Sequence, residues 1–159
     1  MELLLDLQAD CADAALPTAS DCDCWVRAAL AGRRERAELT IRFVDESEGA
    51  DLNQRYRGRT GATNVLSFPF EPPPGFPEAI DLLGDLVICV PVAVVQAADR
   101  CKPLRAYWAH LVVHGVLHLL GHDHEDAREA DVMEALESDI LRGLGFASPY
   151  EEIESSDDD

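Results

Sequence analysis

All five histidines of the chain fall between His110 and His124, and residues 114–124 read HGVLHLLGHDH. His114 and His118 are four positions apart, so on an α-helix they are offset by about 40° and project from one face. Gly121 predicts the end of that helix, because glycine adopts the left-handed conformation of a helix terminus without steric cost. His124, three residues later, can fold back toward the same point. The segment therefore predicts a helix, a turn and a third side chain gathered around one metal ion.

Three imidazoles suit a catalytic metal site, because they leave one position of a tetrahedral Zn²⁺ open for water. Ni, Cu and Fe also accept imidazole ligands. A rival set of His110, His114 and His118 spreads over about 12 Å along a helix, too far for an ion bound at about 2 Å. We therefore predict zinc ligands at His114, His118 and His124. His110 is expected to be a packed or hydrogen-bonded core residue, and His122 a surface or supporting one.

The same segment matches the metzincin protease signature HExxHxxGxxH at every defined position but one. Where a protease carries the Glu that takes a proton from the zinc-bound water, this chain has Gly115. Asp85 and Asp123 are the carboxylates that could substitute. A metallopeptidase is therefore a weaker interpretation than another metal-dependent hydrolase.

Length and composition fit one domain, because 159 residues of which 47% are apolar can bury a single core. The five cysteines form no CxxC pair, which indicates neither a disulfide framework nor a cysteine zinc site. No apolar run approaches the roughly 20 residues of a membrane span, and the N-terminus lacks the basic region of a signal peptide. We expect a soluble, cytoplasmic protein that does not act at a membrane, with its domain in residues 1–150.

The net charge of −18 is distributed unevenly along the sequence. Residues 151–159 hold six acids and no base, which predicts an acidic disordered tail. The acidic stretch 123–139 is expected to be the wet face of a helix. Basic residues gather at 33–36, read as an exposed loop, and at 55–59. The second group is mainly arginine, the residue suited to bidentate phosphate recognition, and it leads into an apolar strand.

Hydrophobic periodicity predicts four strands and five helices in mixed order. The strands are expected at 1–7, 37–44, 64–70 and 82–90, and the helices at 20–31, 45–56, 91–101, 103–120 and 125–144. Ser20–Asp23 resembles the capping box of the first helix, and Pro69 marks its strand as an edge or a strand end. This order predicts one α+β domain, zincin-like, in which a mixed four-stranded sheet backs the histidine helix.

Three blocks of the chain resemble the signatures of the YbeY family, bacterial metal-dependent endoribonucleases of ribosomal RNA maturation. The blocks are LNQRYRGRTGATNVLSFPF (52–70), LGDLVICV (83–90) and YWAHLVVHGVLHLLGHDH (107–124). They occur in the family's order and spacing, and the likeness extends over about residues 1–150. The acid and proline usual in the loop after the family's arginine are here Thr60 and Ala62.

The resemblance implies Zn²⁺ held by His114, His118 and His124, with His114 and Arg57 as the catalytic residues. It also implies a single-strand-specific endoribonuclease that acts in 3′ end maturation of 16S rRNA and in ribosome quality control. Ribosomal RNA and the small ribosomal subunit would be its partners. Histidine spacing alone predicts only the metal and hydrolytic chemistry. A metallopeptidase remains an alternative, as does an assembly factor with a structural metal whose acidic surface docks a basic ribosomal protein.

Overall fold

A computed structural model describes residues 2–10, 16–72, 74–75, 81–122 and 126–149 of the chain. Three predictions lie outside these residues: the metal ligand His124, the alternative base Asp123, and the acidic tail 151–159.

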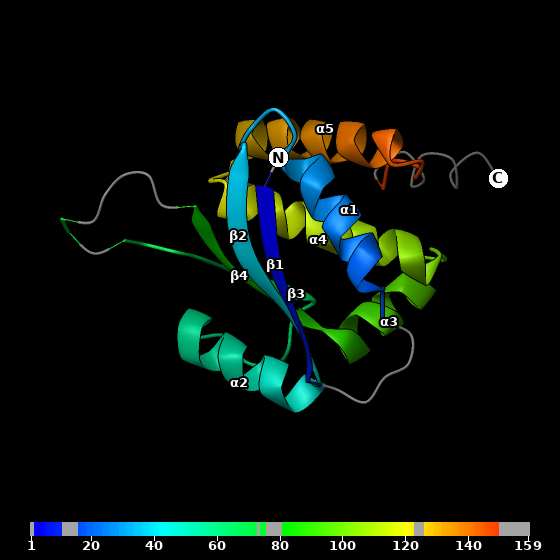
Figure 1. The fold of residues 1–159 in the computed structure, drawn as a ribbon. Coiled ribbons are helices and arrows are strands. Elements are labelled where there is room, and N and C mark those ends of the chain that lie inside the picture. Colours follow the sequence, from blue (N-terminus) through cyan, green and yellow to red (C-terminus); the bar gives the residue numbers. More distant parts are fainter. Residues whose placement is uncertain (1, 11–15, 73, 76–80, 123–125, 150–159) are drawn as a thin grey trace.

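A mixed four-stranded sheet forms the centre of the fold (Figure 1). Strand β1 (Glu2–Asp10) pairs in parallel with β2 (Arg36–Val44), and β2 pairs in parallel with β4 (Leu82–Cys89). Strand β3 (Val65–Pro69) pairs antiparallel with β4, which gives the order β1-β2-β4-β3. β3 is therefore an edge strand, as Pro69 predicted, because proline cannot donate a hydrogen bond to a neighbouring strand.

Five helices complete the single α+β domain that the sequence predicted. They are α1 (Ala19–Leu30), α2 (Glu46–Arg57), α3 (Val90–Asp99), α4 (Leu104–Leu119) and α5 (Ala127–Gly143). The prediction of a capping box at Ser20–Asp23 was wrong by two residues. Thr18 caps α1, since its hydroxyl accepts from the backbone N–H of Asp21 and its own N–H donates to the Asp21 carboxylate.

The helices are divided between the two faces of the sheet. α1, α4 and α5 lie on one face, over the main hydrophobic core, and α2 lies on the other (Figure 1). α4 contacts α1, α3, α5, β3 and β4, and ten of its sixteen residues are buried. A helix that is apolar nearly all round is held by packing on every side. Its histidines therefore stand on a rigid element.

Candidate metal centre and cleft

α4 presents three histidines along one face, and all three side chains are half-buried. The ring centroids of His110 and His114 are 6.1 Å apart, and those of His114 and His118 are 4.7 Å apart. The prediction that His114 and His118 share one helical face is confirmed.

The chain leaves α4 at the glycine that the sequence indicated. Gly121 has φ +103°, and the N–H of His122 donates to the carbonyl of Leu117 at 3.0 Å. This backbone bond turns the chain back over the last turn of α4. His122 is half-buried, and His124 follows just beyond the described segment.

A cleft of about 610 Å³ opens beside the histidine face of α4. His114 and His118 form one side of it. The other residues that line it come from α2, β3 and the loop between them: Asn53, Arg57, Arg59, Thr60, Ala62, Thr63, Asn64, Val65 and Ser67. The fold thus brings Arg57 to the same cleft as His114 and His118, whereas His110 is not among the lining residues.

Arg57 owes its place to the end of α2. Gly58 adopts the left-handed conformation with φ +65°, and its N–H donates to the carbonyls of Asn53 and Gln54. The buried Asn53 side chain also donates from Nδ2 to the carbonyl of Gly61 at 2.7 Å. These hydrogen bonds hold the loop after α2 against the helix, so Arg57 lies at a fixed helix terminus.

The strand side of the cleft is fixed by a polar network around Asn64. Its Nδ2 donates to Oε1 of Gln96 at 3.0 Å, and the hydroxyl of the buried Tyr107 donates to the same oxygen at 2.6 Å. Arg100 donates to the Tyr107 hydroxyl at 3.0 Å. These bonds connect the start of β3 to α3 and α4.

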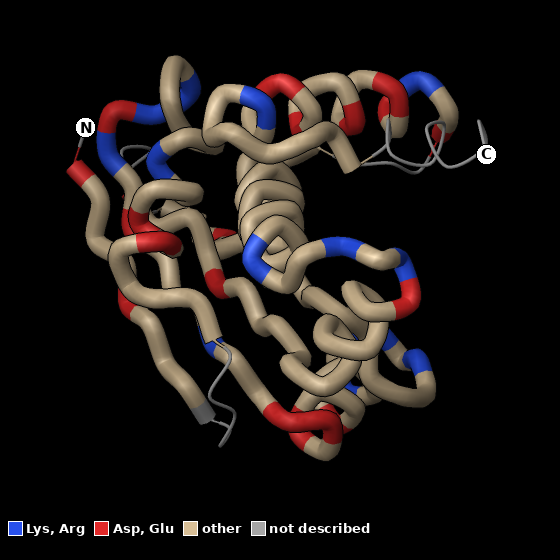
Figure 2. The backbone as a smooth tube through the Cα atoms, turned by 90° about the vertical axis from the view of Figure 1, so that its right-hand side faces the viewer, with Lys and Arg blue, Asp and Glu red and all other residues tan. Residues whose placement is uncertain are grey.

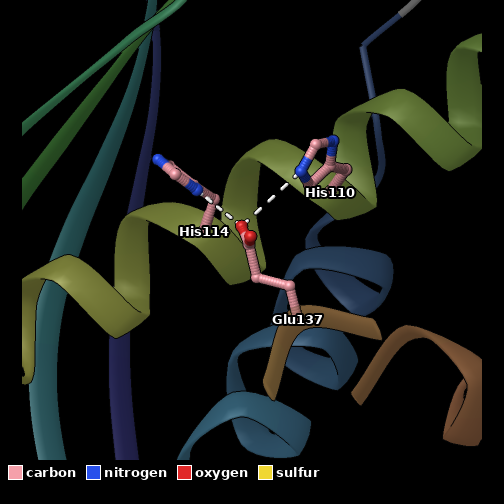
Figure 3. Close-up of side chains that lie close together, drawn as sticks. All are labelled: His110, His114 and Glu137. Carbon is pink, nitrogen blue, oxygen red and sulfur yellow. Dashed lines mark hydrogen bonds and ion pairs between the residues drawn. The ribbon is translucent and has the colours of Figure 1, made fainter. Parts of the chain in front are cut away.

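Glu137 of α5 is buried beneath the histidine face, with only 1% of its side chain exposed. Its Oε2 lies 2.5 Å from Nδ1 of His114 and 3.5 Å from Nε2 of His110 (Figure 3). Burial raises the pKa of this carboxyl, but the hydrogen bonds to His110 and His114 outweigh it and lower the pKa to about 2. Glu137 therefore carries its negative charge inside the protein.

Sequence reasoning missed Glu137, although the pattern of α5 held a signal. The residue lies four positions after the buried Met133 and four before the buried Leu141. An acid on the apolar stripe of a helix indicates a partner inside the fold.

The described donor groups fit a metal ion. His110, His114 and Glu137 offer one ligand atom each, all within 4.8 Å of one another, so their proximity alone would allow them to share an ion. The adjacent rings of His114 and His118 both line the cleft, and neutral imidazole is a ligand that Zn, Ni, Cu and Fe accept. Half-buried imidazoles at an open cleft are the donors expected of a catalytic metal site.

Position 115 cannot take the part of the metzincin glutamate. A Cβ at Gly115 would lie 2.7 Å from Cδ2 of Leu86, so this position faces the sheet and not the cleft. Asp85 is exposed, and it alternates along β4 with the buried Leu86, which places it on the opposite face. The suggestion of Asp85 as an alternative base was therefore wrong.

Charged residues are distributed unevenly along the folded backbone (Figure 2). The exposed side of α5 and its cap is acidic, as predicted, and carries Asp126, Glu129, Asp131, Glu134 and Asp139. Arg57 and Arg59 line the cleft instead. Within the described ranges, none of the helices has the length and apolar character to cross a membrane.

Comparison with known proteins finds relatives that match most of the chain. A family model described as Endoribonuclease YbeY matches residues 15–145. Two curated proteins named Endoribonuclease YbeY come from Xanthomonas oryzae pv. oryzae, strains MAFF 311018 and KACC10331 / KXO85. Each is 57% identical over 139 residues, which cover 86% of this chain and 86% of the relative.

A solved structure shares the fold. The solution structure of TM1509 from Thermotoga maritima has a TM-score of 0.58 and 18% identity, and covers 89% of this chain and 91% of that one. At this identity the likeness supports the fold alone. The match over residues 15–145 and the 57% identity show more: the chain belongs to the YbeY endoribonuclease family.

Proposed function

We propose that this chain is a zinc-dependent endoribonuclease that cleaves single-stranded RNA. The observation that carries the proposal is the cleft, which Arg57 and Arg59 line together with His114 and His118. Imidazoles and guanidinium groups facing one cavity are what a metal-assisted reaction on a phosphodiester requires. The family relation supplies RNA as the substrate.

We assign the metal to His114, His118 and His124, with Zn²⁺ as the ion. When bound there, the ion supplies a water whose pKa is lowered to about 7 and a Lewis acid for a phosphoryl oxygen. The rest of the site orients the substrate. Arg57 stabilises the negative charge that develops on the phosphate, because its planar fork can contact two oxygens at once.

An exposed aromatic side chain beside this arginine supports a preference for unpaired RNA. Tyr56 is 63% exposed and precedes Arg57 on α2. Its ring contacts Phe68 of β3 edge to face, with centroids 5.4 Å apart. Aromatic rings held in place by a neighbour stack on unpaired bases, which a duplex does not offer.

We further propose the cytoplasm as the site of action, and 3′ end maturation of 16S rRNA and ribosome quality control as the process. These follow from the family relation and from an rRNA substrate. The exposed carboxylates of α5 favour an additional contact with a basic ribosomal protein on the small subunit. This contact would be compatible with catalysis, because α5 contributes no residue to the lining of the cleft.

The decisive experiment joins metal analysis to an RNA-cleavage assay on the purified protein, with and without a chelator. We expect bound zinc, cleavage of single-stranded RNA, and loss of both on chelation. A second arm offers an unstructured protein as substrate. Chelator-sensitive proteolysis without RNA cleavage would favour the peptidase. Bound metal with neither activity would favour the assembly factor.

A further inference from the structure

The carboxylate of Glu137 is buried beneath the histidines of α4. The residue is 0% exposed, and its carboxylate contacts His110 and His114 of α4. An acid at such a position is retained only where specific hydrogen bonds offset its desolvation. Such a carboxylate can serve either as a metal ligand or as the hydrogen-bond partner of a ligand.

The distance between the Glu137 carboxylate and the His114 ring distinguishes these two roles. Oε2 of Glu137 lies 2.5 Å from Nδ1 of His114, the length of a short, charge-assisted hydrogen bond. Two atoms bound to the same tetrahedral zinc at about 2.0–2.1 Å stand roughly 3.3 Å apart. Glu137 and Nδ1 of His114 therefore do not have the spacing of two ligands of one ion.

The orientation of the His114 ring also indicates that Glu137 is not a metal ligand. Nδ1 faces Glu137, and Nε2, on the other side of the ring, points away from it (Figure 3). His114 lines the cleft, whereas neither Glu137 nor His110 does. The carboxylate thus stands behind the imidazole with respect to the cleft.

We propose that Glu137 is a positioning residue, which accepts a hydrogen bond from Nδ1–H of His114 and thereby directs Nε2 of this imidazole into the cleft. A carboxylate behind a metal-binding histidine fixes its tautomer and rotation and raises its basicity as a ligand. His110 contacts the same carboxylate and braces it. The inference rests on the proposed role of His114 as a metal ligand, and it excludes Glu137 and His110 from the ligand set.

The first test needs no metal and no variant of Glu137. Two-bond ¹H–¹⁵N correlation of the metal-free wild-type protein, above the titration range of histidine, reports which ring nitrogen carries the proton. The His114 signals are assigned by their loss in His114→Asn. We expect the proton on Nδ1. A proton on Nε2 would overturn the proposal, whatever the protein does to RNA.

The second test removes the carboxylate. Glu137→Met should abolish the Nδ1–H preference and weaken zinc binding about 10–100-fold at unchanged stoichiometry. Glu137→Gln keeps an oxygen that accepts from Nδ1–H and should restore part of both. Glu134→Met, exposed and one turn earlier on α5, is the matched control and should change neither.

The variant His110→Ala distinguishes whether His110 and Glu137 bind the metal or only position His114. If His110 and Glu137 were ligands, His110→Ala and Glu137→Met would each lower the metal stoichiometry, and the proposal would fail. If Glu137→Met does not fold, the wild-type tautomer and the stoichiometry of His110→Ala still decide. A wild-type protein that shows the Nδ1–H tautomer but binds no zinc would count against the proposed function and not against the hydrogen bond.

Discussion

The histidines of α4 are alike in spacing but differ in what they face. His118 lines the cleft together with His114, whereas His110 contacts Glu137 on the inner side. We predict that His118→Ala lowers bound zinc and removes most of the rise in Tm caused by zinc. A ligand at 100–1,000 times its Kd stabilises the native state by about 3–4 kcal/mol, and this gain depends on the site.

His110→Ala provides the comparison, because it should leave zinc content nearly unchanged. Metal analysis after gel filtration and thermal unfolding with added zinc are the two measurements. If His110→Ala empties the site while His118→Ala does not, the ligand assignment on α4 is wrong.

We predict that Arg57 acts on the substrate and not on the fold. It is exposed, and it occupies the last position of α2. We expect Arg57→Ala to retain zinc and Tm while RNA cleavage falls by about 10²–10³-fold, the usual effect of removing a group that stabilises developing charge. Arg57→Lys should recover little of the activity, because an ammonium does not reproduce the planar fork.

A neighbouring arginine serves as the control for Arg57. Arg55 is also exposed, forms an i,i+4 ion pair with Asp51 at 3.3 Å, and does not line the cleft. Arg55→Ala should leave cleavage near the wild-type rate. Equal losses in the two variants would show that general positive charge on α2, and not Arg57 in particular, supports the reaction.

The sequence predicted only part of this site, for physical reasons. The shared face of His114 and His118 follows from the period of a helix, and the break at Gly121 follows from glycine chemistry. Glu137 could not be paired with His114 in advance, since the two residues belong to different helices and meet only through packing. The orientation of position 115 was hidden for the same reason, because Leu86 comes from a strand nearly thirty positions earlier.

Helices and strands were predicted more completely than their arrangement. Every strand and helix lies close to its predicted range, because turn residues and changes of period mark the boundaries. The insertion of β4 between β2 and β3 was not predicted, although β3 precedes β4 in the chain. Strand order depends on which faces bury against the helices, and local periodicity carries little information on this.

The contact between α4 and the sheet depends on a missing side chain. A Cβ at Gly115 would come within 2.7 Å of Leu86 Cδ2, so Gly115→Ala should overpack this contact and destabilise the protein by about 1–3 kcal/mol. Combining Gly115→Ala with Leu86→Val should reduce the cost, because valine has no δ carbons. Denaturant unfolding of the double-mutant cycle measures the coupling, and strictly additive effects would contradict this picture.

The same packing decides what Gly115→Glu would do. The change restores the HExxH pattern, but its side chain would enter the interface with β4 instead of the cleft. We expect poor folding and no peptidase activity. A folded Gly115→Glu protein with zinc-dependent proteolysis would show that position 115 faces the metal.

α1 and α4 are joined by a surface ion pair whose effect depends on pH. Arg105 donates to the carboxylate of Asp21 at 2.6 Å, and this bond, with help from Thr18, lowers the pKa of Asp21 below its usual 3.8. A depressed pKa contributes stability above the unfolded value, and this contribution disappears as pH falls through the folded one. We predict that Arg105→Gln lowers Tm slightly at pH 6 and has a smaller effect at pH 3.

Thermal unfolding of both proteins at the two pH values tests this prediction. Arg34→Gln, which changes an exposed arginine in the turn between α1 and β2, is the control for the loss of one positive charge. An equal loss of Tm at pH 6 and pH 3 would mean that Arg105 acts through its packing on Trp25, which it also contacts.

At the scale of the whole molecule, a protein with net charge −18 can bind a polyanion only where its positive charges are concentrated. Acidic residues lie on the exposed side of α5, whereas Arg57 and Arg59 line the cleft, where they can meet phosphate. We expect repulsion from the remaining surface to confine a flexible single strand to the cleft. RNA should therefore make few ionic contacts.

This confinement predicts a shallow salt dependence of RNA binding. Each neutralised phosphate of a single strand contributes about −0.7 to the slope of log K against log salt, so two arginines give about −1.4. Anisotropy of a labelled 2′-O-methyl oligonucleotide, which resists cleavage, measures the slope. Arg59→Ala should make it shallower by about 0.7, because Arg59 lines the cleft, whereas Arg34→Ala should not change it. A wild-type slope steeper than about −3, reduced by Arg34→Ala, would show that RNA extends to the basic segment 33–36 and that the acidic surface does not confine it.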